Sequence, residues 1–208
     1  MPTSGRGATR RITSRIFITI GVGLGALVFP SLANAACTLS SPCGSPPVSL
    51  GTIDEATGTS VAFGTNADGS VIVGQSATGL VDQFGHTLYH AFRSTAAGQV
   101  SDLGTLGNVS GVSIATATNS DGSVVVGQSA TTFTDTFGTT LSHAFRWTIN
   151  DGMADLGTLQ SVVGNSRANG ISADGSVVVG FSTAPQDPNG STYYHAFRWT
   201  RNVSQSRA

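Results

Sequence analysis

The sequence predicts an all-β protein made of tandem four-stranded antiparallel repeats, because three motifs return at one interval. DGSVIVGQS and its close variants begin 53 residues apart, at Asp68, Asp121 and Asp174. SLGTI and two copies of DLGTL also begin 53 residues apart, at Ser49, Asp102 and Asp155. HAFR begins at spacings of 53 and 52 residues, at His90, His143 and His195. Internal repeats of roughly this length are typical of solenoids and propellers.

Each repeat is predicted to form two hairpins in series. In the first repeat, Ser60–Asn66 and Ser70–Ser76 flank the pair Asp68-Gly69. Asp-Gly between apolar runs predicts a type I′ turn, which has positive φ at both central residues. Tyr89–Thr95 and Gln99–Leu106 are expected to pair across a second turn of two residues.

The middle strand of each repeat is continuously apolar, at Val71–Val73, Val124–Val126 and Val177–Val179. Such strands are buried on both faces, as in sheets that stack on one another. A radially stacked four-stranded meander is the blade of a β-propeller. The alternative is a β-solenoid, with shorter coils of parallel strands. Because Asp-Gly turns favour antiparallel hairpins, we expect a propeller-like fold.

This propeller is predicted to be incomplete. The repeats occupy residues 49–101, 102–154 and 155–208, whereas known propellers close with roughly four to eight blades. In the third repeat, no DLGTL follows HAFRWT. We therefore expect a fragment, a truncated gene product, or a chain that completes the repeat array by self-association.

Residues 1–35 have the pattern of a secretory signal peptide. Four arginines precede the apolar run Ile16–Phe29, and small residues follow it up to Ala33-Asn34-Ala35. A positive start, a short apolar stretch and an A-x-A end are typical of cleaved export signals. A membrane anchor needs about 20 apolar residues. We expect export to the periplasm, cell surface or extracellular space, with no membrane span after cleavage.

Residues 36–48 are predicted to be a linker that contains both cysteines, Cys37 and Cys43. An oxidising compartment would allow a small disulfide loop between them. The metal alternative is weak, because two thiolates alone make only half a zinc site.

The charge of the chain argues against a nucleic-acid partner. Charged residues make up 10% of the chain, and all ten basic residues are arginine. Four arginines lie in the signal peptide, so six arginines and all 11 acidic residues remain, a formal net charge of −5. We therefore expect no nucleic-acid partner, since such proteins carry basic patches.

The combined signature DLGTL, DGSVVVGQS and HAFRW resembles the HAF family of extracellular repeats. The resemblance covers Ser49 to about Thr200, and both the spacing and the flanking motifs agree. It implies a bacterial exported protein, similar in some cases to an autotransporter passenger, with no general enzymatic activity. One departure is that nothing after Ala208 could form the outer-membrane barrel of an autotransporter.

Equivalent positions in the repeats are expected to have the same packing roles, because symmetry-related residues normally do the same work. These positions are His90, Phe92, Arg93, Asp102, His143, Phe145, Arg146, Asp155, His195, Phe197 and Arg198. Arg93 and Asp102 are nine residues apart, and so are Arg146 and Asp155. Across a two-residue turn they would face each other, which predicts one cross-strand ion pair in each of the two repeats.

No catalytic, metal or cofactor site is predicted. Three equivalent histidines around an axis could hold an ion, but a partial ring disfavours this. The DGS turns resemble calcium loops, yet each has one carboxylate, and turn chemistry explains it. The chain contains no G-x-S-x-G elbow, HExxH motif or Walker loop.

The predicted function is non-catalytic binding or presentation of an unknown surface ligand or protein. The binding surface would be the loops that vary most between repeats, Ala77–Leu88, Ala130–Ser142 and Thr183–Tyr194, because recognition usually lies on such loops. The alternatives are a fragment of a propeller-type enzyme and a degraded gene product without function.

Overall fold

The computed structural model describes residues 47–96, 98–107, 111–160, 163–185 and 191–201. The predicted signal peptide, most of the linker, and Cys37 and Cys43 lie outside the described residues. A short 3₁₀ turn, η1 (Ile53–Glu55), precedes the first sheet. Every other element of the described chain is a β-strand. The all-β prediction is therefore confirmed.

The strands form three antiparallel meanders, one in each repeat. The first sheet contains β1 (Ser60–Thr65), β2 (Val71–Val81), β3 (Thr87–Thr95) and β4 (Val100–Asp102). The second contains β5 (Ser113–Thr118), β6 (Val124–Thr134), β7 (Thr140–Thr148) and β8 (Gly152–Asp155). The third contains β9 (Ser166–Ile171), β10 (Val177–Thr183) and β11 (Tyr194–Thr200). All pairings are antiparallel, unlike the coils of a solenoid.

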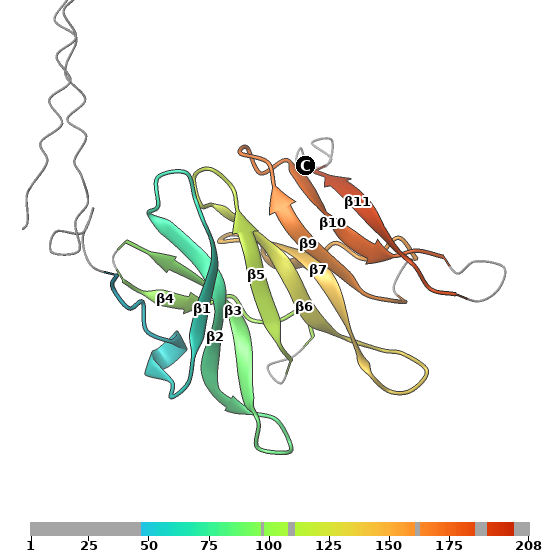
Figure 1. Ribbon diagram of the computed structural model, residues 1–208, viewed down its shortest axis with the longest axis horizontal. Helices are drawn as coiled ribbons and strands as arrows, with labels where there is room; N and C mark the ends of the chain where they lie inside the picture. The colour runs from blue at the N-terminus through green and yellow to red at the C-terminus, as the bar shows by residue number, and fades with distance from the viewer. Residues whose placement is uncertain (1–46, 97, 108–110, 161–162, 186–190, 202–208) are drawn as a thin grey trace, which may run out of the picture. The chain divides into compact units, whose positions relative to one another are not determined.

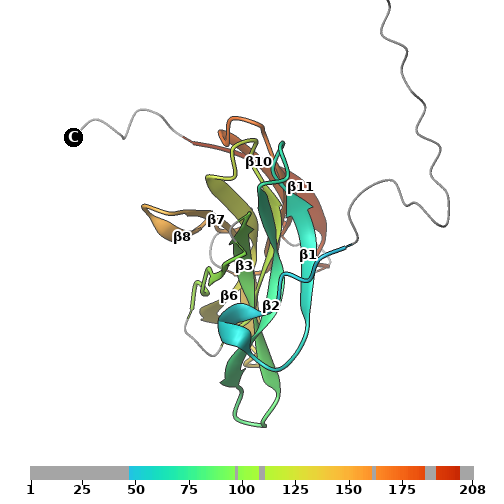
Figure 2. The same ribbon diagram turned by 90° about the vertical axis from the view of Figure 1, so that its left-hand side faces the viewer.

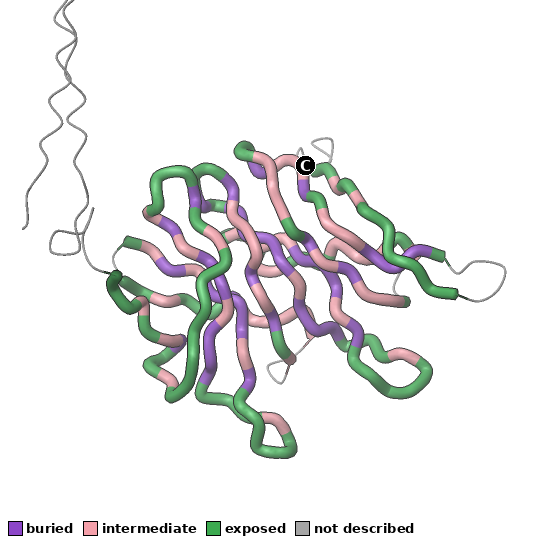
Figure 3. Tube along the Cα trace, in the orientation of Figure 1, coloured by how far each residue is buried: buried purple, intermediate pink, exposed green. Residues whose placement is uncertain are grey.

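The three sheets pack face to face in chain order, in the manner of consecutive propeller blades (Figures 1 and 2). The first strand of each following sheet lies against the sheet before it, β5 against β2 and β3, and β9 against β6 and β7. Buried residues concentrate in the middle of the stack, and exposed residues at the hairpin ends (Figure 3). The arrangement matches the predicted incomplete propeller.

The cores lie between neighbouring sheets, as the apolar middle strands predict. Val71, Val73 and Ala91 of the first sheet pack with Ala115 and Val125 of the second. The cluster between the second and third sheets has the same construction, with Val126, Ala144, Ala168 and Val178. Burial of apolar area between the sheets is the main force that holds such a stack together.

The DGS turns differ from the predicted type I′ geometry. Gly69 has a φ of 76°, whereas Asp68 keeps a negative φ. The Asn66 N–H donates to the Val71 carbonyl at 3.0 Å, which leaves four residues in the loop. The Asn66 Oδ1 also accepts the Val71 N–H at 2.9 Å and fixes this longer loop. The type I′ prediction is therefore wrong, because side-chain bonding favours the four-residue form.

Two of the three predicted variable loops are mostly strand, whereas the third, Thr183–Tyr194, lies between the end of β10 and the start of β11 and is only partly described. β2 continues to Val81 and β3 begins at Thr87, so the loop predicted over Ala77–Leu88 shrinks to 82–86. The second loop, Ala130–Ser142, shrinks in the same way to 135–139. The residues that extend these strands beyond the stack are exposed. The extensions were not predicted because exposed residues lack the apolar pattern that identifies a strand in sequence.

The glycine of each VGQS or VGFS motif makes room for two neighbours. A Cβ at Gly74 would overlap the Val61 carbonyl oxygen and lie 2.8 Å from the Phe92 ring. Gly127 and Gly180 have equivalent contacts with the Ile114 and Arg167 carbonyls. The first strand of each sheet (β1, β5 or β9) has a bulge at this point, which brings its backbone close to the middle strand.

Replacing Gly74 with alanine should therefore destabilise the fold by roughly 1–3 kcal/mol, the cost of overpacking a core. Gly79→Ala is a matched control in the same strand, because no heavy atom lies within 4 Å of its Cβ position. Urea unfolding should place the control within about 0.5 kcal/mol of wild type. Equal stability of the two variants would contradict the close approach at Gly74.

Candidate functional site

The HAFR histidines of the first two repeats lie inside the stack, each bonded to an aspartate of its own sheet. His90 and His143 are 2% and 0% exposed. The His90 Nδ1 lies 2.8 Å from the Asp102 Oδ2, and the His143 Nδ1 lies 2.8 Å from the Asp155 Oδ2. An ionised carboxylate only accepts hydrogen bonds, so the imidazole Nδ1–H is the donor.

The predicted Arg–Asp ion pairs are wrong, because the register is shifted by one residue. Asp102 lies opposite Phe92, and Arg93 lies opposite Ser101. In the second sheet, Arg146 lies opposite Ala154. Thr148 pairs with Gly152, so the turn has three residues where two were predicted. A shift of one residue turns a side chain to the other face of the sheet, which brings the aspartate to the histidine.

Neither Arg93 nor Arg146 lies opposite the DLGTL aspartate of its own sheet. The Arg93 Nε donates to the Gly122 carbonyl in the DGS turn of the second sheet, at 2.9 Å. The Arg146 Nε has no hydrogen-bond partner among the described residues. Burial lowers the pKa of Arg146, the nearby charge of Arg201 adds to this shift, and the charge of Asp151 opposes it in part.

DLGTL carries the chain from one sheet to the next and bonds to both. The Asp102 Oδ1 accepts the Gly104 N–H at 2.7 Å, in a turn where Gly104 has a φ of 73°. The Leu103 N–H then donates to the Ala91 carbonyl at 2.9 Å. Asp155, Gly157 and Leu156 make the same bonds after the second sheet. Each aspartate thus joins the buried histidine to the connection between sheets.

A serine at the start of each following sheet completes the set of hydrogen bonds at the connection between two sheets. We call this set, formed by the HAFR histidine, the DLGTL segment and this serine, the junction. The Ser113 Oγ accepts the Ala91 N–H at 2.8 Å and donates to the Gly104 carbonyl at 2.6 Å. Ser166 makes the same two bonds, with Ala144 and Gly157. Sequence reasoning assigned these serines no role. Their spacing of 53 residues, shared with Ser60, was the available signal.

The aspartate carboxylates are held ionised. Burial raises the pKa of Asp102, but the hydrogen bond from His90, the Gly104 N–H and the nearby imidazole outweigh it, and the net shift is downward. The same balance lowers the pKa of Asp155 below its ordinary value of 3.8, with His143 and Gly157 as partners. Both shifts favour the charged form of the aspartate that accepts the imidazole N–H.

The third repeat presents its HAFR residues differently. His195 and Arg198 are exposed on β11, and Phe197 is half-buried. No aspartate follows them among the described residues, which end at Arg201. The packing role predicted for these positions is therefore seen for His90, Phe92, His143 and Phe145, which are buried.

The buried histidines have no access to a substrate. The His143 ring lies beside the Phe133 ring at a centroid distance of 5.6 Å, and its Nε2 is buried without a described hydrogen-bond partner. No group of three or more histidine, cysteine or acidic residues in the described chain could hold a metal ion.

The DGS aspartates serve their own turns. Asp68, Asp121 and Asp174 each accept the backbone N–H two residues ahead, at 2.9 to 3.1 Å. Hydrogen bonds from Ser172 and Ser176 lower the pKa of Asp174 to about 2. These bonds match the turn chemistry expected from the sequence.

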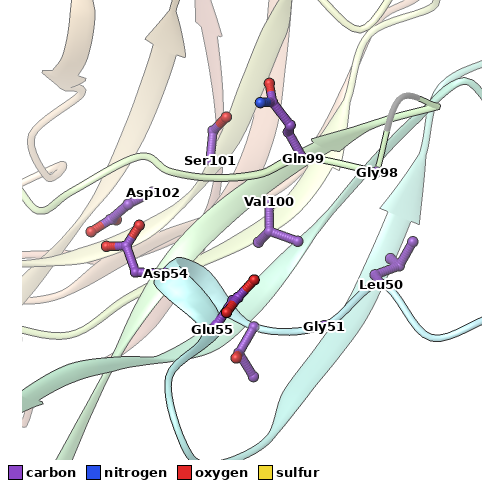
Figure 4. A pocket seen from close by; sticks show the side chains of 10 residues that line it. Leu50, Gly51, Asp54, Glu55, Gly98, Gln99, Val100, Ser101 and Asp102 are labelled. Carbon is purple, nitrogen blue, oxygen red and sulfur yellow. The ribbon is translucent and has the colours of Figure 1, made fainter.

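One hollow of about 850 Å³ lies between the η1 segment and β4. Asp54, Glu55 and Asp102 contribute carboxylates to its lining, with Asp54 and Asp102 on the same side (Figure 4). Asp102 is already engaged by His90 and Gly104.

Comparisons with known proteins identify no relative. No family model, curated protein or solved structure matches the chain. Within the described part of the chain, no helix is long and apolar enough to cross a membrane.

Replacing Asp155 with asparagine should lower the free energy of unfolding by about 1 kcal/mol at pH 7, because a charge-assisted bond is lost while the carboxylate, 34% exposed, is partly screened. The folded pKa lies below the ordinary 3.8, so the stabilisation is present above that pH and is lost as the pH falls below it.

Urea unfolding of wild type and Asp155→Asn at a series of pH values should therefore show a gap that closes in acid. Asp54→Asn, which changes an exposed carboxylate, is the control and should leave stability unchanged at pH 7. A gap that persists unchanged at acid pH would show that the charge of Asp155 does not stabilise the junction.

Proposed function

We propose that this chain is an exported bacterial HAF-repeat protein that binds or presents a surface ligand or protein without catalysis. The signal-peptide pattern of residues 1–35 and the three-motif signature support this proposal. A further support is the use of the repeated His, Asp and Ser positions, which connect one sheet to the next in the first two repeats. These residues therefore have a structural role, and the stacked sheets hold the hairpins in fixed positions.

The observation that carries the proposal is a set of apolar side chains at the hairpin ends. Phe84 and Phe137 lie 53 residues apart at equivalent positions and are 75% and 91% exposed. Leu80 and Val81 of the first hairpin, and Tyr193 and Tyr194 of the third repeat, are also exposed. Apolar patches exposed on a protein surface mark sites of interaction with other molecules.

Side-chain hydrogen bonds order the ends of the β2–β3 and β6–β7 hairpins. The Asp82 Oδ1 accepts the N–H groups of Phe84 and His86, at 2.8 and 2.9 Å. Asp135 makes the equivalent bonds to Phe137 and Thr139, both at 2.9 Å. Each phenylalanine is therefore presented by a pre-ordered loop, which lowers the entropy cost of binding. The partner would present an apolar patch.

Export predicts a mature protein that begins at Ala36. Expression in a bacterium with general secretion should give this N-terminus by Edman sequencing of the periplasmic or secreted fraction. Leucine at both Ala33 and Ala35 should block processing, whereas Ala26→Leu, inside the apolar run, should not. Full-length protein confined to the cytoplasm would contradict export.

Binding through the hairpin ends predicts that the double variant Phe84→Ser, Phe137→Ser loses most of its attachment to cells. The test is flow cytometry of fluorescent protein on intact cells of the bacterium that encodes it. Gln83→Ser with Thr136→Ser is the matched control, because both residues are exposed neighbours in the same loops. Equal attachment of wild type and the phenylalanine variant would overturn the proposed surface.

A further inference from the structure

The last sheet leaves open a face that is buried in the other two. Val73 and Ala91 face the second sheet and are both 0% exposed. Val126 and Ala144, 53 residues further on, face the third sheet and are also 0% exposed. At the next step, Val179 is 46% exposed and Ala196 is exposed. The third sheet therefore presents the residues of a sheet-to-sheet contact without a described sheet against them.

The first sheet leaves open the opposite face. Ala115 and Ala168, which receive the preceding sheet, are 0% exposed. Ala62 is the equivalent residue of the first sheet and is exposed. Ile72 is half-buried, whereas its equivalents Val125 and Val178 are 0% exposed. The two ends of the stack are thus the two halves of one interface that the chain already makes twice.

The hydrogen-bonding groups of that interface are also divided between the two ends. The Ala91 and Ala144 N–H groups donate to Ser113 and Ser166 of the following sheet. Ala196 holds the equivalent place on β11, opposite Phe181. Ser60 holds the place of the serine, and its Oγ already donates to the Gly51 carbonyl at 2.6 Å, as Ser113 does to Gly104. Both partners are in the junction geometry before they meet.

We propose that a second copy of this chain docks head to tail, with its Ser49–Ile53 segment and β1 against β10 and β11. In this junction the Ala196 N–H donates to the Ser60 Oγ of the second copy. The Leu50 N–H of the second copy donates to the Ala196 carbonyl, as Leu103 and Leu156 do within the chain. Two such contacts close two copies into a ring of six sheets, within the range of roughly four to eight known for propellers.

One substitution makes the junction between copies different from those within the chain. Ser49 occupies the position of Asp102 and Asp155. Its Oγ accepts the Gly51 N–H at 3.2 Å, where the aspartates accept Gly104 and Gly157 at 2.7 Å. In the ring, His195 would meet a neutral hydroxyl in place of a carboxylate. The contact between copies is therefore weaker than the internal junctions.

The first test is the mass of the purified chain in solution, by light scattering after size exclusion. We expect twice the mass of one chain. Val179→Asp should give a monomer with unchanged circular dichroism, because this residue is exposed in a single copy. Val81→Asp, an exposed valine in the extended β2–β3 hairpin, is the matched control and should remain dimeric.

The second test strengthens the contact. Ser49→Asp restores the carboxylate at both junctions of the ring and should tighten the dimer about a hundredfold, because each charge-assisted bond contributes about tenfold. The gain should vanish when His195→Ala is combined with it, as a double-mutant cycle requires.

A monomeric wild-type chain would overturn the proposal, and so would a dimer that Val179→Asp leaves intact. A mass that rises with concentration beyond two copies would overturn the closed ring. A tightening by Ser49→Asp that survives His195→Ala would overturn the assigned contact. None of these results depends on which ligand the hairpin ends bind.

Discussion

The outer strand β4 is short, so one residue of β3 has a backbone N–H and carbonyl that β4 does not reach. Other parts of the stack must provide hydrogen-bond partners for these two groups. β4 ends at Asp102, opposite Phe92, so the main chain of Ala91 has no strand partner on its outer side. Ala91 is fully buried, and an unpaired buried N–H or carbonyl costs roughly 1–3 kcal/mol. The Leu103 N–H and the Ser113 Oγ meet these two groups. Since Ser113 belongs to the next sheet, one sheet is complete only when the following one is in place.

The residues that recur in the HAF and DLGTL motifs each have a distinct contact at or beside this edge of β3. Histidine fixes the aspartate, which in turn bonds the Gly104 N–H and sets the turn of the connection. Alanine leaves space for the serine of the next sheet to approach the backbone. Phenylalanine lies against the glycine of the middle strand, where a Cβ would collide with its ring. The three residues of the HAF motif thus contact three different neighbours: the aspartate of DLGTL, the serine of the next sheet and the glycine of the middle strand.

The period of the repeats predicted the strands and their stacking, but the register depended on details that sequence does not resolve. A turn of three residues in place of two moved Asp155 from Arg146 to His143. Both turns are compatible with the same Gly and Asp residues. The extent of the hairpins was missed for a related reason: Leu80, Val81 and Phe84 are exposed in a strand and its loop, where burial imposes no alternation.

The low charge of the chain follows from the stacking of apolar sheet faces. The outer faces of the first and third sheets share this apolar character. Repeat proteins normally end in capping repeats with a polar outer face, because an apolar face in water favours association. Val179 and Ala196 repeat the residues of the buried internal faces. The first sheet keeps Ala62 and Ser60, the counterparts of buried Ala115 and Ser113. A difference at the first sheet is Ser49, which stands in place of the carboxylates Asp102 and Asp155. In the proposed head-to-tail dimer, that change would weaken docking and leave the apolar and backbone contacts in place, as expected of an interface between separate copies that forms after each chain has folded.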